Sequence, residues 1–405
     1  MKRPGLVVLI TLALTLSAFP IAIGSAEQIT ITVAATYKSE MDAYMADFYS
    51  RYPNIKVEFA GAGFTNPEKI FTLEAAGTPM DIYYVRGTEI HMYIAKGILE
   101  PIDAYIQKYN YSINDFVAQS LVSVQGQDGK LYGLPYDIGV NVQYYNRDHL
   151  AEAGVAASFL NNWTFNDMKD LAHKLMRVNA DGQVTRVGYT PVNWNSWSFE
   201  GNYLAPWGAR MFSDDESSLL LSEPAALTAL SWWQQTLQDP AIVVGKSFPK
   251  NQTSLAVAGI WEIGSYNAVT GLDFDLGLLP VGPAGRYSSF QSSGYGISRQ
   301  SKQKEAAWIF LSDWMGPRGM ELYWAKTKMP ARWSAIKHFA ELFLKDKNMS
   351  SLEQTLSIML LGRPVFPPGE AFYTQSKKLF SQFWSNELSP VQLADSAASL
   401  FSSMK

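Results

Sequence analysis

Residues 28–59 read QITITVAATYKSEMDAYMADFYSRYPNIKVEF, and their hydrophobic pattern decides the fold class. Residues 28–34 alternate apolar and polar side chains and are rich in β-branched residues, which predicts a strand. From Ser39 to Tyr52 the apolar residues recur at helical spacing, and the following Pro53 ends the helix. Residues 55–59 alternate again. The stretch therefore predicts strand, helix, strand, which is the repeating unit of an α/β sheet.

The same order of elements continues toward the C-terminus. The patterns predict helices at residues 69–76 and 91–96 around a buried strand at residues 81–85. Further on they predict helices at residues 164–178 and 223–238, a strand at residues 274–279 and a largely helical tail. An open, mostly parallel α/β sheet is the fold class that accommodates this alternation.

Composition excludes several classes of protein. The chain has 405 residues, enough for two or three domains at about 150 residues each. Hydrophobic residues make up 47% and charged residues 17%, which excludes a disordered chain. The formal net charge is −4 and no run of five like charges occurs, so we expect no nucleic-acid partner. Cysteine is absent and the 4 histidines are far apart, so we expect no metal and no cofactor.

The first 26 residues predict a signal peptide. Lys2 and Arg3 precede an uncharged, largely apolar stretch at residues 4–26, and the small residues Gly24 and Ala26 favour cleavage before Glu27. The alternative is an uncleaved anchor helix, because the apolar span approaches the thickness of a bilayer. A lipid anchor would need a cysteine, which the chain lacks. We therefore expect a periplasmic or secreted protein.

Motifs for catalysis are absent or weak. Gly61-Ala62-Gly63 lacks the third glycine of a dinucleotide loop, because Asn66 occupies that position, and no G-x-S-x-G nucleophile elbow occurs. Glycoside hydrolysis needs only two carboxylates across a sugar cleft, so an exported glycoside hydrolase stays open as an alternative. We expect a protein that is not an enzyme.

The aromatic residues give a positive indication. Trp194, Trp197, Tyr203 and Trp207 lie close together among Asn and Ser residues, in a stretch with neither helical nor strand periodicity. Flat apolar rings beside amides and hydroxyls match a pyranose, which has an apolar face and a ring of hydroxyls. The alternative is that most aromatic residues are core. The stretch therefore favours sugar binding, with Trp194 and Trp197 as candidate ligand-binding residues.

Several motifs resemble those of the family 1 extracellular solute-binding proteins of ABC transporters. The resemblance begins at residues 48–58, FYSRYPNIKVE, and continues at residues 75–83, AAGTPMDIY. Further motifs follow in the family's order, so that the match covers nearly all of residues 28–400: GILEPID at 97–103, DGKLYGLP at 128–135, YYNRD at 144–148, AGIW at 258–261, LPVGPAG at 279–285 and MPAR at 329–332.

The resemblance implies a maltose-binding-protein-like fold, the type II periplasmic-binding-protein fold, with two α/β lobes and a ligand cleft between them. It implies that the chain crosses between the lobes near residues 137–139, 277–280 and 329–332. We accordingly expect an N-terminal lobe of residues 27–137 plus 279–329. The C-terminal lobe then comprises residues 138–278 plus 330–405.

Two arguments select further ligand-binding candidates. Ligands of open α/β sheets lie beyond the carboxyl ends of strands, which selects Tyr37 and Glu40 after the first strand and Arg86 and Glu89 after the strand at residues 81–85. The resemblance adds five positions: Asp137, Trp261, Tyr295, Arg363 and Tyr373. Many relatives carry Trp where Tyr295 stands, and Phe372 is the alternative to Tyr373 at another position where relatives place an aromatic residue. Trp261 is the strongest candidate for a sugar-stacking platform, because it follows the short apolar strand at residues 256–260.

These observations predict the substrate-binding subunit of a carbohydrate ABC importer. The resemblance implies a monomer that closes on a sugar and delivers it to a membrane permease, without bond chemistry. The alternative within the family is another solute such as a glycerol phosphate, which would need several cations in the cleft.

Overall fold

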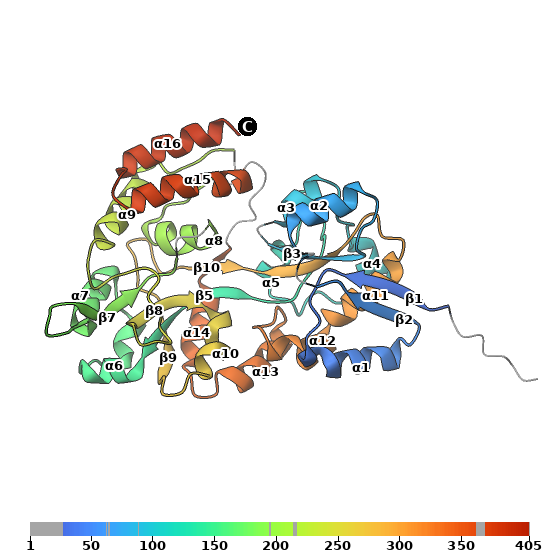
Figure 1. The fold of residues 1–405 in the computed structure, drawn as a ribbon, viewed down its shortest axis with the longest axis horizontal. Helices are drawn as coiled ribbons and strands as arrows, with labels where there is room; N and C mark the ends of the chain where they lie inside the picture. Colours follow the sequence, from blue (N-terminus) through green and yellow to red (C-terminus); the bar gives the residue numbers. More distant parts are fainter. Residues whose placement is uncertain are drawn as a thin grey trace, which may run out of the picture.

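The computed structural model describes residues 27–404, except for residues 62, 64, 88, 194–195, 214–216 and 362–368. The described chain forms two α/β lobes, each built on its own sheet (Figure 1). The expected signal peptide, residues 1–26, lies outside the described residues. Within the described ranges, no helix has both the length and the apolar character needed to cross a membrane.

The first lobe is built on a 5-stranded sheet. Its strands lie in the order β2 (Ile55–Phe59), β1 (Ile29–Val33), β3 (Ile82–Arg86), β11 (Ser293–Ile297) and β4 (Leu134–Pro135). β1, β2 and β3 are parallel, whereas β11 runs antiparallel to both of its neighbours. The strand, helix, strand order predicted for residues 28–59 is confirmed, with α1 (Asp42–Arg51) between β1 and β2.

Helices cover both faces of this sheet (Figure 1). Figure 1 shows α1 below it and α2 (Pro67–Ala75) and α3 (Ile90–Ala95) above it. The other helices of this part of the chain are α4 (Asp103–Lys108), α5 (Ala118–Val122), α11 (Lys304–Trp314) and α12 (Pro317–Leu322). Phe310 and Trp314 of α11 are buried in the first-lobe core, which fixes this late segment against the early strands.

The second lobe is built on a 7-stranded sheet. Its main path runs β12 (Met359–Leu361), β10 (Ser288–Gln291), β5 (Gly139–Asn146), β8 (Thr253–Gly259), β7 (Val184–Thr190) and β6 (Arg177–Val178). β9 (Phe274–Gly277) pairs with the later part of β5. Every residue of β5 is buried, as expected for the central strand of a covered sheet.

The helices of the second lobe follow several of the predicted patterns. α7 (Phe165–Leu175) begins at a capping box formed by Thr164 and Asp167, and α9 (Pro224–Thr236) begins at a proline. Both predicted helices are confirmed with slightly shorter bounds. The remaining helices are α6 (Arg147–Glu152), α8 (Ser196–Phe199), α10 (Ile263–Asn267), α13 (Trp333–Phe343), α14 (Met349–Ser357), α15 (Gly369–Trp384) and α16 (Pro390–Ser402).

Three segments connect the lobes, and they are hydrogen bonded to one another. Residues 136–138 join β4 to β5, and Ser292 alone joins β10 to β11. Residues 329–331 run beside the first connection, where Ile138 N donates to Met329 O at 2.8 Å and Ala331 N donates to Tyr136 O at 3.1 Å. Ser292 Oγ donates to Asp137 O at 2.7 Å. The connections therefore form one hydrogen-bonded group with Asp137 at its centre.

The second connection differs in position from the expectation of residues 277–280. β9 ends at Gly277, but β10 at residues 288–291 still pairs with β5 and β12 of the second sheet. The segment 279–291, which we expected in the first lobe, therefore lies with the second sheet, and the chain crosses at Ser292. The turn-rich sequence around Pro280 resembled the end of a lobe, whereas the strand SSFQ at 288–291 is too short and polar to show alternation.

Candidate functional site

The carboxyl ends of strands from both sheets converge on the connections between the lobes. In the first sheet, Arg86 at the end of β3 pairs with Ser293 at the start of β11. In the second sheet, Gln291 at the end of β10 pairs with Gly139, and Gly259 at the end of β8 pairs with Asn141. Only Ser292 separates these two sets of strand ends. Open α/β sheets bind ligands beyond such carboxyl ends, so this convergence locates the candidate site.

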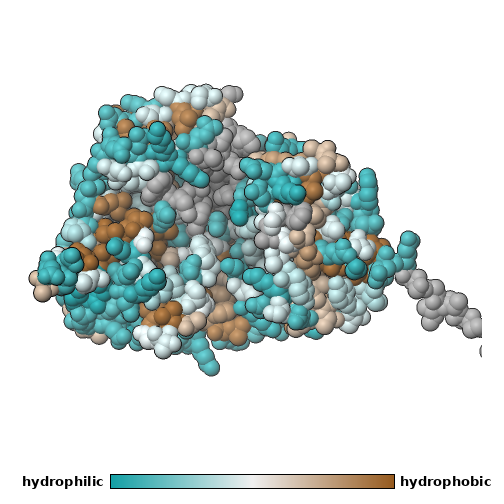
Figure 2. All heavy atoms as spheres, viewed as in Figure 1, coloured by the Kyte–Doolittle hydropathy of each residue, from teal (hydrophilic) through white to brown (hydrophobic). Residues whose placement is uncertain are grey.

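The molecular surface is hollowed at the same place between the lobes. In Figure 2 the hollow lies between the part of the molecule formed by α15 and α16 and the part formed by α2 and α3, as labelled in Figure 1. Both lobes therefore have side chains beside the hollow, which is the arrangement that a ligand bridging two lobes requires.

Asp137 is held within the connections themselves. Ser293 N donates to Asp137 Oδ1 at 2.8 Å, and the backbone of Asp137 forms a bridge with Pro330. Burial raises the pKa of the Asp137 carboxyl to about 6, although the hydrogen bond from Ser293 and the charge of Lys328 lower it. A carboxylate in this position can accept hydrogen bonds from a ligand hydroxyl.

Arg86 and Glu89 form a polar wall on the first-lobe side. Arg86 Nη1 lies 2.7 Å from Glu89 Oε1, and the Arg86 guanidinium lies 5.6 Å from the centre of the Tyr84 ring. Tyr84 Oη donates to Ser293 Oγ at 3.2 Å, which ties this wall to the connection between the lobes. The other carboxylate oxygen of Glu89 is buried and has no hydrogen-bond partner among the described residues. It is an available acceptor.

Trp261 supplies an aromatic surface on the second-lobe side. It lies in a short 3-10 helix, Ile260–Glu262, directly after β8, and its side chain is partly exposed. The indole covers the backbone of two glycines at the end of the sheet: a Cβ on Gly259 would lie 2.1 Å from Trp261 Cζ2, and one on Gly139 would lie 3.3 Å from Trp261 Cζ3. Gly139 is two residues after Asp137, so the indole and that carboxylate lie along the same strand connection.

Three other candidates are placed differently. Tyr295 is only 6% exposed and packs against Trp314, with ring centres 4.6 Å apart, and against Tyr84 at 5.5 Å. A buried ring presents almost no face to a ligand, and the ligand-binding role of Tyr295 stays a prediction. Tyr37 is 45% exposed and its hydroxyl donates to Asp42, which raises its pKa to about 12. Glu40 is exposed, and its charge adds to the burial that raises the pKa of the nearby Tyr323.

The remaining candidates fall partly or wholly outside the described residues. Trp194 and Arg363 lie in the undescribed ranges. Trp197 belongs to α8 and Tyr373 to α15, but the described structure does not extend to their side chains.

A buried polar network, which sequence reasoning missed, fixes the aromatic stretch to the second sheet. Asn202 Nδ2 donates to Asn141 Oδ1 at 2.8 Å, to Ser289 Oγ at 2.9 Å and to Ser198 O at 2.9 Å. Gly201 makes the close approach possible, because a Cβ there would lie 2.5 Å from Ser289 Oγ. Single Asn and Ser residues carry no local pattern, so only the paired strands reveal that they meet.

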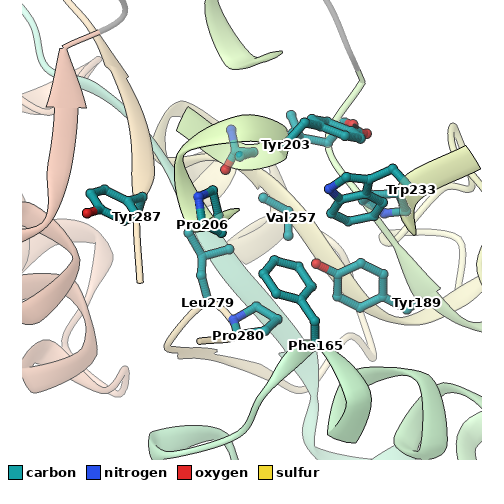
Figure 3. A pocket seen from close by; sticks show the side chains of 12 residues that line it. Phe165, Tyr189, Tyr203, Pro206, Trp233, Val257, Leu279, Pro280 and Tyr287 are labelled. Carbon is teal, nitrogen blue, oxygen red and sulfur yellow. Dashed lines mark hydrogen bonds between the residues drawn. The ribbon is translucent and has the colours of Figure 1, made fainter. Parts of the chain in front are cut away.

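A small pocket lies inside the second lobe, beneath this network (Figure 3). Phe165, Tyr189, Tyr203, Pro206 and Trp233 are among its mostly apolar lining. The cavity volume is about 20 Å³, and the Nε1 of Trp233 and the Oδ1 of Asn202 find no partner among the described residues. This volume is close to that of one water and excludes a sugar ring. The pocket is therefore not the candidate solute site.

Two lobes whose strand ends meet at polar and aromatic side chains define a solute-binding protein. The chain belongs to the bacterial extracellular solute-binding protein family, which it matches over residues 34–317. It is 23% identical over 339 residues to a maltooligosaccharide ABC transporter solute-binding lipoprotein of Streptococcus pneumoniae, a match that spans 78% of this chain and 75% of that protein.

Solved structures share the fold. An ABC substrate-binding protein of Listeria monocytogenes, in complex with cycloalternan, is similar with a TM-score of 0.77 and 21% identity, over 93% of this chain and 98% of that one. UgpB of Mycobacterium tuberculosis, in complex with glycerophosphocholine, is similar with a TM-score of 0.75 and 17% identity, over 94% and 98%. The expected two-lobed fold is confirmed. Since these two solved proteins bind different solutes, the fold alone does not choose the ligand.

Proposed function

We propose that this protein is the substrate-binding subunit of a carbohydrate ABC importer. The observation that carries the proposal is the convergence of Glu89, Asp137 and Trp261 where the strand ends of both sheets meet. Carboxylates accept hydrogen bonds from hydroxyl groups, and an indole stacks on the apolar face of a pyranose. A neutral sugar or oligosaccharide offers both kinds of group.

The charges of the described site favour a sugar over a glycerol phosphate. A phosphate needs several cationic donors, whereas the described Arg86 is already paired with Glu89 at 2.7 Å and the charge of Lys328 already acts on Asp137. Glu89 and Asp137 together bring two carboxyl groups toward this region, which would repel a phosphate. The name of the streptococcal relative, which binds maltooligosaccharides by its description, agrees with this choice.

We infer that the lobes close on the ligand and that the closed form is presented to membrane permease subunits. The sheets support a division into residues 27–137 plus 293–329 and residues 138–291 plus 330–405, joined at the connections described above. Closure requires a ligand with higher affinity for the closed state, and contacts from both lobes provide that difference. Export by a cleaved signal peptide at residues 1–26 and action in the periplasm as a monomer complete the proposal.

We further propose that the protein binds its sugar without cleaving it. Family membership supports this, since the family is defined by solute binding. Incubation with a panel of oligosaccharides, followed by chromatography of the products, separates the two possibilities. Intact ligand after prolonged incubation is expected, and the release of shorter sugars would assign a glycoside hydrolase instead.

Isothermal titration against mono- and oligosaccharides, with glycerol 3-phosphate and glycerophosphocholine in the same panel, tests the ligand class. At least one sugar is expected to bind, whereas neither of the two phosphate compounds is expected to bind. Trp261→Ala is expected to weaken that binding about tenfold or more. Trp333→Ala is the matched control, because Trp333 is 51% exposed on α13, on the opposite side of the molecule from α15 and α2 (Figure 1). Binding of a phosphate compound alone would overturn the proposal.

A further inference from the structure

A second aromatic groove lies on the surface of the second lobe, apart from the region between the lobes. It is lined by Thr164, Phe165, Asn166, Trp207, Trp232 and the turn at residues 281–283, and its volume is about 420 Å³. That volume is within the range of small-molecule sites. Its walls come from the start of α7, from the 3-10 helix Ala205–Trp207, from α9 and from the loop after β9. Figure 1 shows α7 and α9 on the side of the second lobe that faces away from the first lobe.

Three rings shape this groove. The ring centres of Trp207 and Trp232 are 5.1 Å apart, with their planes inclined at 46°. The buried Phe165 ring supports both, at 4.7 Å from Trp207 and 5.2 Å from Trp232. The two indoles are partly exposed, so they form two inclined apolar walls that Phe165 holds from below. Such rigid rings offer contact area at little cost in conformational entropy.

The polar groups of the groove are neutral, and all but the Thr164 hydroxyl, which is bonded to Asp167, are available. None of the residues that line it is charged. Asn166 is exposed, and neither its side-chain amide nor the indole N–H of Trp207 or Trp232 forms a hydrogen bond within the described part of the chain. Gly282 keeps the turn close to the wall, since a Cβ there would lie 2.3 Å from Pro206 O. Apolar faces flanked by free neutral donors and an amide oxygen suit a neutral polyhydroxylated ligand.

We propose that this groove is a second carbohydrate-binding site, which holds part of a neutral glycan chain on the outer face of the second lobe. Lys169 Nζ lies 5.9 Å from the centre of the Trp232 ring, but none of the lining residues is cationic, so a phosphate or a carboxylate would find a single nearby cation and not the several donors that it needs. This site would keep the protein close to a polysaccharide from which its solute is released, while the region between the lobes stays free.

Affinity electrophoresis of the intact protein tests this proposal. The protein migrates through native gels with and without soluble starch, galactomannan, xylan or arabinan as the probe. At least one of these polysaccharides is expected to retard the wild type. Trp232→Ala and Trp207→Ala are each expected to weaken that retardation about tenfold, and Asn166→Ala, at an exposed position, to weaken it without affecting folding.

Two variants separate this site from the region between the lobes. Trp261→Ala is expected to lose sugar affinity in titrations and to keep its retardation, and Trp333→Ala is expected to keep both. Failure of every polysaccharide to retard the wild type overturns the second site and leaves the proposed function intact. Retardation that is lost in Trp261→Ala but kept in Trp232→Ala and Asn166→Ala also overturns it, because the glycan would then bind between the lobes. Melting temperatures show whether the tryptophan variants are folded.

Discussion

The indole of Trp261 occupies the space that a side chain on Gly259 would fill. A Cβ on Gly259 would lie 2.1 Å from Trp261 Cζ2, far inside van der Waals contact. The backbone at Gly259 has φ −72 and ψ 147, which any residue adopts. Glycine is therefore required at this position because of the Trp261 ring and not because of the backbone conformation. Substitution of Gly259 is accordingly a way to displace the indole without removing it.

Gly259→Ala is expected to displace the indole and to weaken sugar binding about tenfold or more, approaching the effect of Trp261→Ala. Both variants should melt close to the wild-type temperature in the absence of ligand, because the indole is partly exposed and the backbone at Gly259 suits alanine. Titration calorimetry and thermal unfolding measure the two quantities. If Gly259→Ala binds sugar with wild-type affinity while Trp261→Ala binds it more weakly, the exact position of the indole matters little for binding.

Asp137→Asn is expected to stabilise the ligand-free protein at pH 7.5 and to have no such effect at pH 4. The Asp137 carboxyl has a pKa of about 6 in the folded protein, against about 3.9 in an unfolded chain. The folded state therefore binds more protons between these values, and its stability falls as the pH rises from about 4 to about 6. Asparagine does not titrate, so the variant does not lose stability in this way as the pH rises. Its Oδ1 can still accept the hydrogen bond from Ser293 N.

The measurement for Asp137→Asn is the difference in melting temperature from wild type across this pH range. A difference that does not change between pH 4 and 7.5 would show that the carboxyl does not titrate there. Sugar affinity at pH 7.5 is expected to fall in the variant, because an amide accepts hydrogen bonds less strongly than a carboxylate.

Tyr295→Ala is expected to destabilise the protein by about 3 to 5 kcal/mol, because it leaves a cavity among buried aromatic rings. Tyr295 is 6% exposed and lies 4.6 Å from Trp314 between ring centres. Tyr37→Ala is the comparison, since Tyr37 is 45% exposed and its loss should cost less than about 1 kcal/mol. Denaturant unfolding measures both. If Tyr295→Ala instead lowers affinity and leaves stability unchanged, Tyr295 contacts the ligand.

Two buried histidines predict a loss of stability in mild acid. Burial lowers the pKa of His91 and of His149 to about 4. An unfolded histidine titrates near 6.5, so the unfolded state binds more protons between pH 6.5 and 4, and stability is lost as the pH falls through this range. His91→Gln is expected to reduce the slope of stability against pH in this window. An unchanged slope in urea unfolding would contradict the assignment to His91.

The sequence predicts the elements of this fold better than it predicts their grouping. Alternation identifies β1 and β2, and the Thr164 and Asp167 capping box identifies the start of α7, because both signals are local. The crossing at Ser292 could not be predicted in this way. It depends on whether β10 pairs with β5, and a strand of four residues carries no signal for its partner.

The rule that ligands lie beyond the carboxyl ends of strands depends on strand direction. It selects Arg86 and Glu89 because β3 runs toward the connections between the lobes. Tyr295, which the resemblance added, is the third residue of β11, a strand that begins at those connections and leads away from them into the core. Ser293 is brought there by the pairing of β11 with β3, and Asn202 meets the second sheet through its hydrogen bond to Asn141, so no local pattern could reveal them.

The place of β11 in the first sheet has a consequence for how the chain acquires its structure. β11 lies between β3 and β4, although residues 293–297 are made long after residues 82–86 and 134–135. A ribosome must therefore produce almost the whole second sheet before the first sheet can close. Contacts between such distant residues slow folding, because the entropy of closing a long loop is lost before the stabilising contacts form. Until residue 297 is available, β3 retains an unpaired edge, and the first sheet stays incomplete.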